Sequence, residues 1–381
     1  MKCFYDNNYK LGILGGGQLG RMLIQKAIDL NVNTYVLDAD ENAPCKSLCT
    51  GFTKGSVSDY QTVLDFGKEL DLITIEFEHV NVDALEALEK MGKKVFPQPR
   101  VIRLVQDKGL QKEFYRSKEL PTADFKLIEN REGLRQEQHF LPFFQKLRKS
   151  GYDGKGVMAV NSESAFGNAF DAPSVLEKYI DFDKEIAVIA ARNEEGEVNT
   201  FPVVELEFNR EANLVEYLFS PADISAAVAE KARSLATQVI QSLEMVGILA
   251  VEMFLTKEGE ILINEIAPRP HNSGHQTIEG NCVSQYEQHL RAILNLPLGK
   301  TDILFPSVML NLLGEKGHEG KASYNNLKTV LSEPGVYVHL YGKTTTKPFR
   351  KMGHVTVINK NLDIARKKAE EIKKTLTITS K

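Results

Sequence analysis

Residues 10–23 read Lys-Leu-Gly-Ile-Leu-Gly-Gly-Gly-Gln-Leu-Gly-Arg-Met-Leu: an apolar run, a cluster of glycines and the start of a helical pattern. The run Lys10–Gly15 predicts a buried strand, and Gln18–Leu30 predicts an amphipathic helix. A strand that passes through glycines directly into a helix is the first half of a βαβ unit. We therefore expect an α/β fold with a parallel sheet, beginning here.

The same alternation continues along the first hundred residues. Strand-like segments are Asn33–Asp38, Leu72–Phe77 and Lys94–Phe96, and helix-like segments are Tyr60–Glu69 and Val82–Met91. Strands interleaved with helices of this length indicate βαβ units. Pro97 and Pro99 close this block.

The rest of the chain is richer in strands and predicts an α+β arrangement. A helical segment at Asp107–Lys118 precedes Leu141–Leu147 and Val157–Val160, which predict an antiparallel hairpin in a small lobe. Further expected elements are strands at Val175–Ile180, Glu185–Ala191 and Val198–Phe208, a helix at about Ser225–Leu243, a hairpin with arms Ile248–Leu255 and Glu260–Ile266, strands at Val308–Leu312, Val336–Leu340 and Val355–Ile358, and a basic helix near Leu362–Lys374.

Length, charge and cysteine content exclude several classes of protein. A chain of 381 residues predicts two or three domains. With 47 basic and 51 acidic residues, its net charge of −4 predicts no general attraction to nucleic acid or anionic lipid. Four scattered cysteines and a start without the layout of a signal peptide predict a cytoplasmic protein with reduced thiols and no membrane anchor.

The glycine loop has more than one interpretation. Gly15, Gly17 and Gly20 satisfy G-x-G-x-x-G between a strand and a helix, and Asp38 ends the next strand. This is the fingerprint of dinucleotide binding in its required context. A single phosphate, or a tight turn without any ligand, would use the same glycines. Arg21 in the first helical turn favours an anionic ligand.

Two acidic residues interrupt the second predicted hairpin, whose arms otherwise look like core strands. Glu252 lies in one arm and Glu265 in the other, and a buried unpaired carboxylate is very unfavourable. If Thr256–Gly259 is the turn, Leu255 pairs with Glu260 and Glu252 faces Ile263, with Glu265 as its diagonal neighbour at about 7–8 Å. At that spacing the two acids can share Mg²⁺ with polyphosphate oxygens. The alternative is that both face solvent.

Glycines and cations gather around residues 146–156. Gly151, Gly154 and Gly156 allow backbone amides to turn towards an anion, with Lys155 at the tip. Lys108 and Lys146 are further phosphate candidates. The alternative interpretation is a hairpin turn that binds no phosphate, with lysines that are only surface charges.

Two more segments concentrate polar groups. Residues 264–275 read Asn-Glu-Ile-Ala-Pro-Arg-Pro-His-Asn-Ser-Gly-His, a density of hydrogen-bonding groups that a surface loop without function seldom needs. Near the C-terminus Lys343, Lys347, Arg350 and Lys351 form either an anion site or a solvated edge.

Taken together, these segments resemble the ATP-grasp superfamily and, within it, the 5-(carboxyamino)imidazole ribonucleotide synthase family of purine biosynthesis. The resemblance covers nearly the whole chain, in family order. It is carried by Gly12–Leu23, Ile73–Val80, Gln106–Lys112, Leu120–Ala123, Ser150–Gly156, Val251–Phe254, Ile263–His275, Pro306–Gly314 and Arg350–His354. The stretch after Asn264 is more specific than either glycine loop.

The resemblance implies three domains. They are a Rossmann-like pre-ATP-grasp domain at 1–105, an ATP-grasp domain at 106–300 with a mobile lid at about 120–180, and a small C-terminal domain at 301–381. It also implies a homodimer and a carboxylating carbon–nitrogen ligase. The implied reaction joins 5-aminoimidazole ribonucleotide with bicarbonate, using ATP and Mg²⁺, and passes through carboxyphosphate to give ADP and phosphate.

Site residues follow from the resemblance position by position. The metal would lie on Glu252 and Glu265, with Asn264 beside it. ATP would contact Lys108, Lys146, Gly151, Gly154, Gly156, Glu177, Lys178, Tyr179, Ile180 and Glu185. Catalytic groups would be Tyr152, Asp153, Lys155 and Arg269. The ribotide and bicarbonate would contact Gly17, Gln18, Leu19, Glu76, His271, Asn272, Ser273, Lys343, Arg350 and Lys351.

One departure and several alternatives accompany this prediction. Phe208 stands where the family often has a nucleotide-contacting His, which leaves one ATP contact open. The alternative functions are a formate-dependent glycinamide ribonucleotide transformylase-like ATP-grasp enzyme, an NAD-dependent dehydrogenase, and a nucleotide-sensing protein without turnover.

Overall fold

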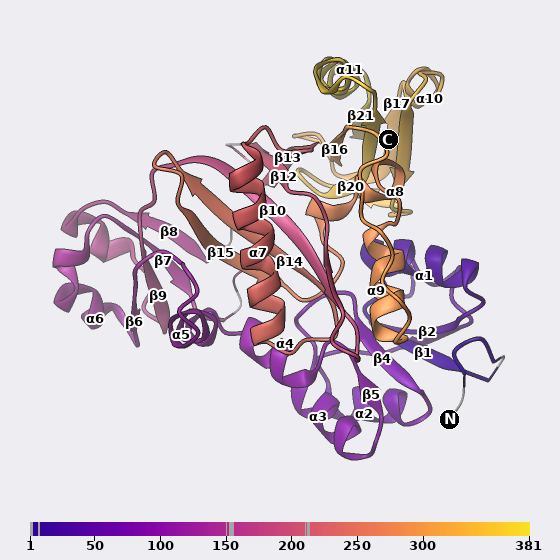
Figure 1. Cartoon of the computed structure of the whole chain (residues 1–381), viewed down its shortest axis with the longest axis horizontal. Helices are drawn as coiled ribbons and strands as arrows, with labels where there is room; N and C mark the ends of the chain where they lie inside the picture. Colours follow the sequence, from indigo (N-terminus) through magenta and orange to yellow (C-terminus); the bar gives the residue numbers. More distant parts are fainter. Residues whose placement is uncertain (1–2, 7, 150, 152–155, 210, 212–213) are drawn as a thin grey trace.

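The N-terminal residues form a parallel sheet with the strand order β3-β2-β1-β4-β5 (Figure 1). The computed structural model describes residues 3–6, 8–149, 151, 156–209, 211 and 214–381. The strands of this sheet are β1 (Lys10–Leu14), β2 (Asn33–Asp38), β3 (Gly51–Lys54), β4 (Leu72–Ile75) and β5 (Lys94–Val95), and its helices are α1 (Gln18–Asp29), α2 (Tyr60–Lys68) and α3 (Val82–Lys90). The predicted elements are confirmed, and β3 is an addition.

A second, antiparallel sheet forms the lobe at the left of Figure 1, in the order β6-β9-β7-β8. It is reached through α4 (Pro99–Val105) and α5 (Lys108–Ser117). Asp107 caps the start of α5, because its carboxylate accepts from the amides of Gly109 and Leu110. Its elements are β6 (Phe125–Ile128), α6 (Arg131–Gln136), β7 (Phe143–Leu147), β8 (Val157–Val160) and β9 (Ser174–Lys178). Strands β7 and β8 pair antiparallel, which confirms the predicted hairpin.

The largest sheet runs in the order β15-β14-β10-β12-β13-β16-β20-β18 and crosses the middle of the molecule. Its central strands are β10 (Phe182–Arg192), β11 (Val198–Thr200, paired with β10), β12 (Val204–Asn209), β13 (Leu214–Ser220), β14 (Gly247–Thr256) and β15 (Ile261–Ala267). Helix α7 (Ala226–Ser242) covers one face, with its buried side chains in one cluster with those of β10, β14 and β15. The single strand predicted at Val198–Phe208 was wrong, since β11 and β12 flank a break at Phe201–Val203 that contains Pro202.

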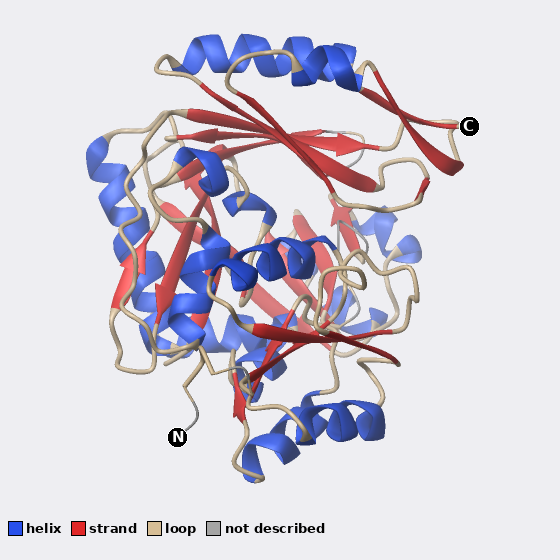
Figure 2. Cartoon of the chain, turned by 90° about the vertical axis from the view of Figure 1, so that its right-hand side faces the viewer, coloured by secondary structure: helices blue, strands red, loops and turns tan. Residues whose placement is uncertain are grey.

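The C-terminal strands continue this central sheet. They are β16 (Ser307–Leu313), β18 (Val336–Leu340) and β20 (Lys351–Ile358), with β16 paired to β13. A smaller sheet of β17 (Gly320–Asn325), β19 (Thr345–Thr346) and β21 (Thr377–Ser380) lies beside them, together with α10 (Leu327–Leu331) and α11 (Leu362–Thr375). Figure 2 shows α11 lying across the outer face of these strands. Hydrogen bonding is therefore continuous from the hairpin that carries the two glutamates to the C-terminal segment.

Helices α8 (Thr277–Gly280) and α9 (Gln285–Ile293) connect the central sheet to the N-terminal domain. Tyr286, Leu290 and Ile293 of α9 pack into the same apolar cluster as α1. This packing places the polar segment 264–275 between the two domains. Among the described residues, no helix combines the length and the apolar character needed to cross a membrane.

Candidate functional site

Glu252 and Glu265 lie directly opposite each other on β14 and β15. The predicted register was wrong, because Leu255 pairs with Ile261 and not with Glu260. A β-bulge then leaves Asn264 without a ladder partner and shifts the register so that Glu252 faces Glu265 and not Asn264. Directly opposite residues of an antiparallel pair point to the same face. The bulge therefore brings the two carboxylates closer together than the diagonal arrangement would.

The two carboxylates repel one another, and they differ in burial, since Glu265 is exposed and Glu252 is largely buried. The Glu252 side chain is 12% exposed. Burial raises the pKa of Glu252 to about 8, and the charges of Glu265 and Glu185 add to the effect. Glu185 stands on the neighbouring strand β10, and burial together with Glu265 raises its pKa to about 7. Such a cluster of acids is stabilised by a cation.

The donor set fits Mg²⁺. In the part of the chain that the structure describes, no three His, Cys, Asp or Glu side chains form a complete metal cage. Mg²⁺ in nucleotide sites is usually held by one or two carboxylates, with phosphate oxygens and water as the remaining ligands. Two facing glutamates match that pattern, and a bound cation would favour the ionised form of Glu252, which burial and the neighbouring acids disfavour.

The raised pKa of Glu252 predicts a pH dependence of stability. Between its unfolded pKa of 4.5 and its folded pKa of about 8, the native state binds more protons than the unfolded state, so stability falls as pH rises. Burial lowers the pKa of His275 to about 3, which makes stability rise with pH, but this contribution is complete above about pH 6.5. We expect the melting temperature of the protein without Mg²⁺ to fall between pH 6.5 and 8.5.

Thermal unfolding in EDTA tests this expectation. The Glu252→Gln variant should have a flatter profile over the same range and be more stable at pH 8.5 by on the order of 1–3 kcal/mol. An unchanged slope in the variant would contradict the assignment.

Two lysines enclose a buried glutamate next to this hairpin. Lys146 donates to Glu177 Oε2 at 2.7 Å and to Asn264 Oδ1 at 3.3 Å, and Lys112 Nζ lies 3.3 Å from Glu177 Oε1. Burial opposes ionisation of Glu177, but the two ammonium groups outweigh it and lower its pKa. Lys108 Nζ donates to the Gly151 carbonyl at 3.1 Å. The structure therefore brings Lys108, Lys146 and Glu177 together beside the β14–β15 hairpin.

The end of β9 shows a mixed outcome for the predicted ATP contacts. The Lys178 ammonium donates to the carbonyls of Phe140 and Leu141, both at 3.1 Å, so its side chain is held within the lid. Tyr179 is 52% exposed and stacks on Phe144 with ring centroids 5.9 Å apart.

Phe208, at the departure from the family pattern, packs against the apolar cluster that contains Ala187. Ala187 pairs with Glu252 and lies two residues from Glu185 on the same strand, so this aromatic ring borders the acidic face of the sheet.

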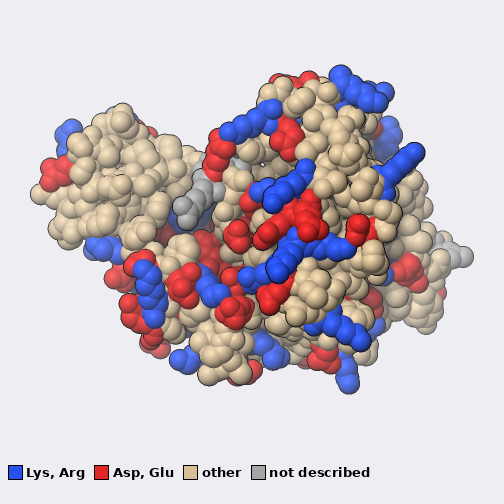
Figure 3. All heavy atoms as spheres, turned by 90° about the horizontal axis from the view of Figure 1, so that it is seen from above, with Lys and Arg blue, Asp and Glu red and all other residues tan. Residues whose placement is uncertain are grey.

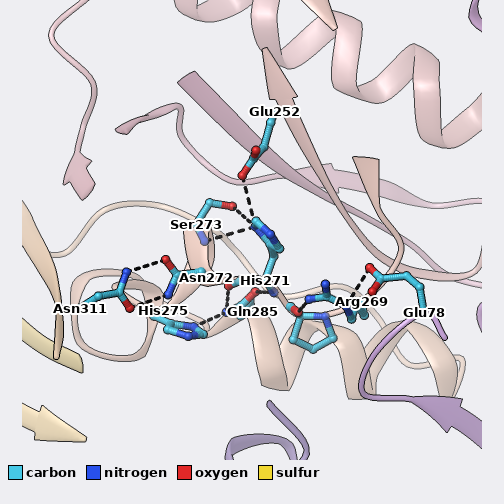
Figure 4. A network of polar contacts seen from close by, with 10 residues as sticks. Glu78, Glu252, Arg269, His271, Asn272, Ser273, His275, Gln285 and Asn311 are labelled. Carbon is cyan, nitrogen blue, oxygen red and sulfur yellow. Dashed lines mark hydrogen bonds and ion pairs between the residues drawn. The ribbon is translucent and has the colours of Figure 1, made fainter. Parts of the chain in front are cut away.

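The segment after β15 forms a polar network (Figure 4). Arg269 Nε lies 2.8 Å from Glu78 Oε1, and His271 Nδ1 lies 3.6 Å from Glu252 Oε1 and 2.9 Å from Ser273 Oγ. Burial and the positive charge of Arg269 lower the pKa of His271 well below its usual value. His271 is therefore neutral beside the acidic pair.

Amide groups fix the rest of this segment. Asn272 exchanges two hydrogen bonds of 2.9 Å with Asn311 of β16, and Gln285 accepts from the His271 amide at 2.8 Å and donates to its carbonyl at 2.7 Å. Of the predicted residues, His271 lies beside Glu252 and contacts Ser273, while Arg269 and Asn272 hold the same segment through Glu78 and Asn311.

The glycine loop has its amides occupied by carboxylates. Asp38 accepts from the Gly16 amide at 2.6 Å, and Glu76 accepts from the Leu19 amide at 3.0 Å. A Cβ at Gly17 would lie 2.5 Å from Glu76 Oε1. A pyrophosphate on these amides would meet two negative groups, which argues against the dinucleotide interpretation. Gly17 and Leu19 thus lie beside Glu76, and their predicted role in binding the ribotide stays a prediction.

Two lysines of the C-terminal segment, Lys343 before β19 and Lys351 at the start of β20, lie near Glu76 and Glu252. The positive charge of Lys343 lowers the pKa of Glu76, against the stronger effect of burial, and Lys351 acts likewise on Glu252. Lys343 also donates to the Lys351 carbonyl at 2.8 Å. Arg350 donates to Thr345, with distances of 2.9 and 2.8 Å to its carbonyl and hydroxyl oxygens. Figure 3 shows basic and acidic side chains interleaved beside the lid.

Some predicted site residues cannot be placed, and some residues that contact the site were not predicted. Tyr152, Asp153, Gly154 and Lys155 lie outside the described residues. Lys112, Glu78, Gln285 and Asn311 were not predicted as site residues, although each contacts one that was. Lys112 and Glu78 occur in segments that carry the family resemblance, so their signal was present.

Three protein-family models match successive parts of the chain. Residues 9–106 match the ribonucleotide synthetase preATP-grasp domain, residues 113–286 the ATP-grasp domain, and residues 307–368 the phosphoribosylaminoimidazole carboxylase C-terminal domain.

Among full-length relatives, phosphoribosylaminoimidazole carboxylase of Vigna aconitifolia, a chloroplastic protein, is 40% identical over 361 residues, which cover 92% of this chain and 64% of the relative. The chain thus spans a little under two thirds of that relative's length. N5-carboxyaminoimidazole ribonucleotide synthase of Bacillus subtilis is 35% identical over 364 residues, covering 93% of this chain and 92% of the relative.

Solved structures with the same fold include members of the same family. The N5-carboxyaminoimidazole ribonucleotide synthetase of Thermotoga maritima has a TM-score of 0.91 at 41% identity, covering 98% of this chain and 100% of its own. The Aspergillus clavatus enzyme, solved with ADP and 5-aminoimidazole ribonucleotide, has a TM-score of 0.87 at 34% identity, covering 97% and 98%.

A Rossmann-like domain joined to a sheet whose hairpin carries two facing glutamates defines a protein of the ATP-grasp class. Identity over nearly the full length of the bacterial relative narrows this class further. The chain belongs to the N5-carboxyaminoimidazole ribonucleotide synthase family.

Proposed function

We propose that this protein carboxylates 5-aminoimidazole ribonucleotide with bicarbonate and ATP, through carboxyphosphate, and releases ADP and phosphate. The observation that carries the proposal is Glu252 facing Glu265 across a β-bulge, beside Lys146 and Asn264. Family membership supports the choice of substrates, since a relative has been solved with ADP and this ribotide.

Glu252 and Glu265 would hold Mg²⁺, which when bound neutralises charge on the phosphates of ATP. Lys146 is already oriented by Glu177 and Asn264, so its ammonium needs little reorganisation to face a phosphate. Lys108 and the amides near Gly151 and Gly156 would close on the same phosphates.

The acceptor side would lie between the domains. Arg269, kept charged by Glu78, would hold bicarbonate, and neutral His271 would face the amine. Glu76 would accept from the ribose, while Lys343, Arg350 and Lys351 would bind the ribotide phosphate. The proposed domain division is 1–105, 106–300 and 301–381. A homodimer and a cytoplasmic location stay predictions.

Steady-state release of ADP tests the function. We expect appreciable release with MgATP and bicarbonate only when 5-aminoimidazole ribonucleotide is present. Release that does not depend on the ribotide would overturn the proposal, and release with formate and glycinamide ribonucleotide would indicate the transformylase alternative. Thermal stabilisation by NAD but not by MgATP would instead support the alternative of an NAD-dependent dehydrogenase.

The lid lysine offers a second test. Lys155→Ala should lower the rate about tenfold, because a closing group no longer positions the reactants, while the melting temperature changes little. Unchanged kinetics would mean that residues 150–156 form only a turn. Lys149→Ala, a lysine of the same segment, is the matched control.

A further inference from the structure

The β-bulge at Asn264 needs support from outside the hairpin. Strand β15 is at the edge of the central sheet, so only β14 pairs with it as a full strand. A bulge removes regular ladder hydrogen bonds and is fixed by its surroundings. Without it, the register set by Leu255 and Ile261 would put Asn264 opposite Glu252, and Glu265 would point to the other face of the sheet.

The segment Leu120–Ala123 contacts β15 at the residue before the bulge. The Ile263 amide donates to the Pro121 carbonyl at 2.8 Å, and the Thr122 hydroxyl donates to the Ile263 carbonyl at 2.7 Å. Thr122 and Ile263 form a parallel bridge outside the regular strands. Both outward backbone groups of Ile263 are therefore satisfied by two consecutive residues of another segment.

Lys112 determines the direction of the Thr122 hydroxyl. Its ammonium lies 2.6 Å from Thr122 Oγ1 and is nearly buried, with 3% of the side chain exposed. An ammonium group only donates hydrogen bonds, and a carbonyl oxygen only accepts them. The hydroxyl must therefore accept from Lys112 and donate to Ile263, which leaves one orientation for its proton.

The other side of the bulge is held as well. Lys146 donates to the Asn264 side chain, and both Lys146 and Lys112 pair with Glu177. Thr122 therefore binds the backbone of Ile263 next to the bulge, and Lys146 binds the side chain of Asn264 at the bulge. The two contacts are linked, because Lys146 and Lys112 both pair with Glu177.

We propose that Thr122, oriented by Lys112, is a positioning residue for the metal site, because it fixes the register that places Glu265 opposite Glu252. The proposal rests on the proposed function only in taking that pair as the Mg²⁺ ligands. Thr122 acts through the backbone of Ile263. Outer groups of this kind typically contribute 10- to 100-fold to metal affinity.

Binding of Mn²⁺ in the presence of ADP, followed by electron paramagnetic resonance, tests this role without turnover. We expect Thr122→Val, which keeps the shape but removes the hydroxyl, to weaken Mn²⁺ binding about tenfold. Thr122→Ser keeps the hydroxyl and should bind Mn²⁺ like the unchanged protein. If the valine variant does not fold, Thr122→Ala gives the same comparison with serine.

The outcomes separate the two proposals. Equal Mn²⁺ affinity in the valine and unchanged proteins would overturn the positioning role, and so would an equal loss in the serine variant. Absence of Mn²⁺ binding with ADP in the unchanged protein would overturn the metal site itself. Weakened binding in the valine variant of a protein that shows no ribotide-dependent ADP release would support the positioning role and reject the function.

Discussion

Replacing Glu265 with Gln is expected to reduce ribotide-dependent ADP release by about a hundredfold or more. The substitution removes one of two facing carboxylates with almost no change in volume, so the metal loses charge while the hairpin keeps its packing. Phosphoryl transfer depends mainly on electrostatic stabilisation, which makes the rate sensitive to this loss. Steady-state assays at increasing Mg²⁺ concentration provide the measurement.

A matched control comes from the same hairpin. Glu258 lies in the exposed turn between β14 and β15, so Glu258→Gln changes net charge equally without touching the site. We expect it to retain full activity. Near-normal activity of Glu265→Gln at saturating Mg²⁺ would refute the metal role.

Replacing Arg269 with Met is expected to lower both stability and activity. The guanidinium lies 2.8 Å from Glu78, and both side chains are largely buried, at 16% and 19% exposed. Removing one partner leaves a buried carboxylate unpaired, and such changes typically destabilise a protein by about 3–5 kcal/mol. Activity should fall about a hundredfold or more, because the group proposed to hold bicarbonate is lost.

A double variant separates these two effects. Arg269→Met combined with Glu78→Gln removes the unpaired charge, so chemical denaturation should show most of the stability restored. Activity should stay low, since the guanidinium is still absent. Recovery of activity together with stability would mean that Arg269 acts only through the fold.

Much of the architecture was accessible from local patterns. The helix and strand periodicities of the first hundred residues predicted the parallel sheet, and the predicted helix at Ser225–Leu243 corresponds to α7. The predicted hairpin of β14 and β15 formed, with Gly259 at φ +83° in its turn. These features depend on hydrophobic periodicity and on turn residues, and both can be recognised from residues that are close together in the sequence.

The candidate site was predictable as a set of residues but not as an arrangement. Glu252 and Glu265 were predicted as diagonal neighbours on one face of the hairpin, and they share that face but lie directly opposite each other, because the prediction assumed a regular ladder. The bulge depends on Thr122, more than 100 residues away, and no local pattern indicates such a contact. Lys112 lies in a segment that carries the family resemblance, but its pairing with Glu177 joins two segments that are far apart in the sequence.

By itself, the sequence determined which elements form, which carboxylates and lysines must find partners, and which family the chain resembles. Tertiary structure alone decided that the glycine loop gives its amides to Asp38 and Glu76, and that Asn264 bulges so that two glutamates meet. The physical reason is that periodicity and turn propensity act over a few residues, whereas register at a sheet edge and the partners of buried charges are set by segments brought together on folding.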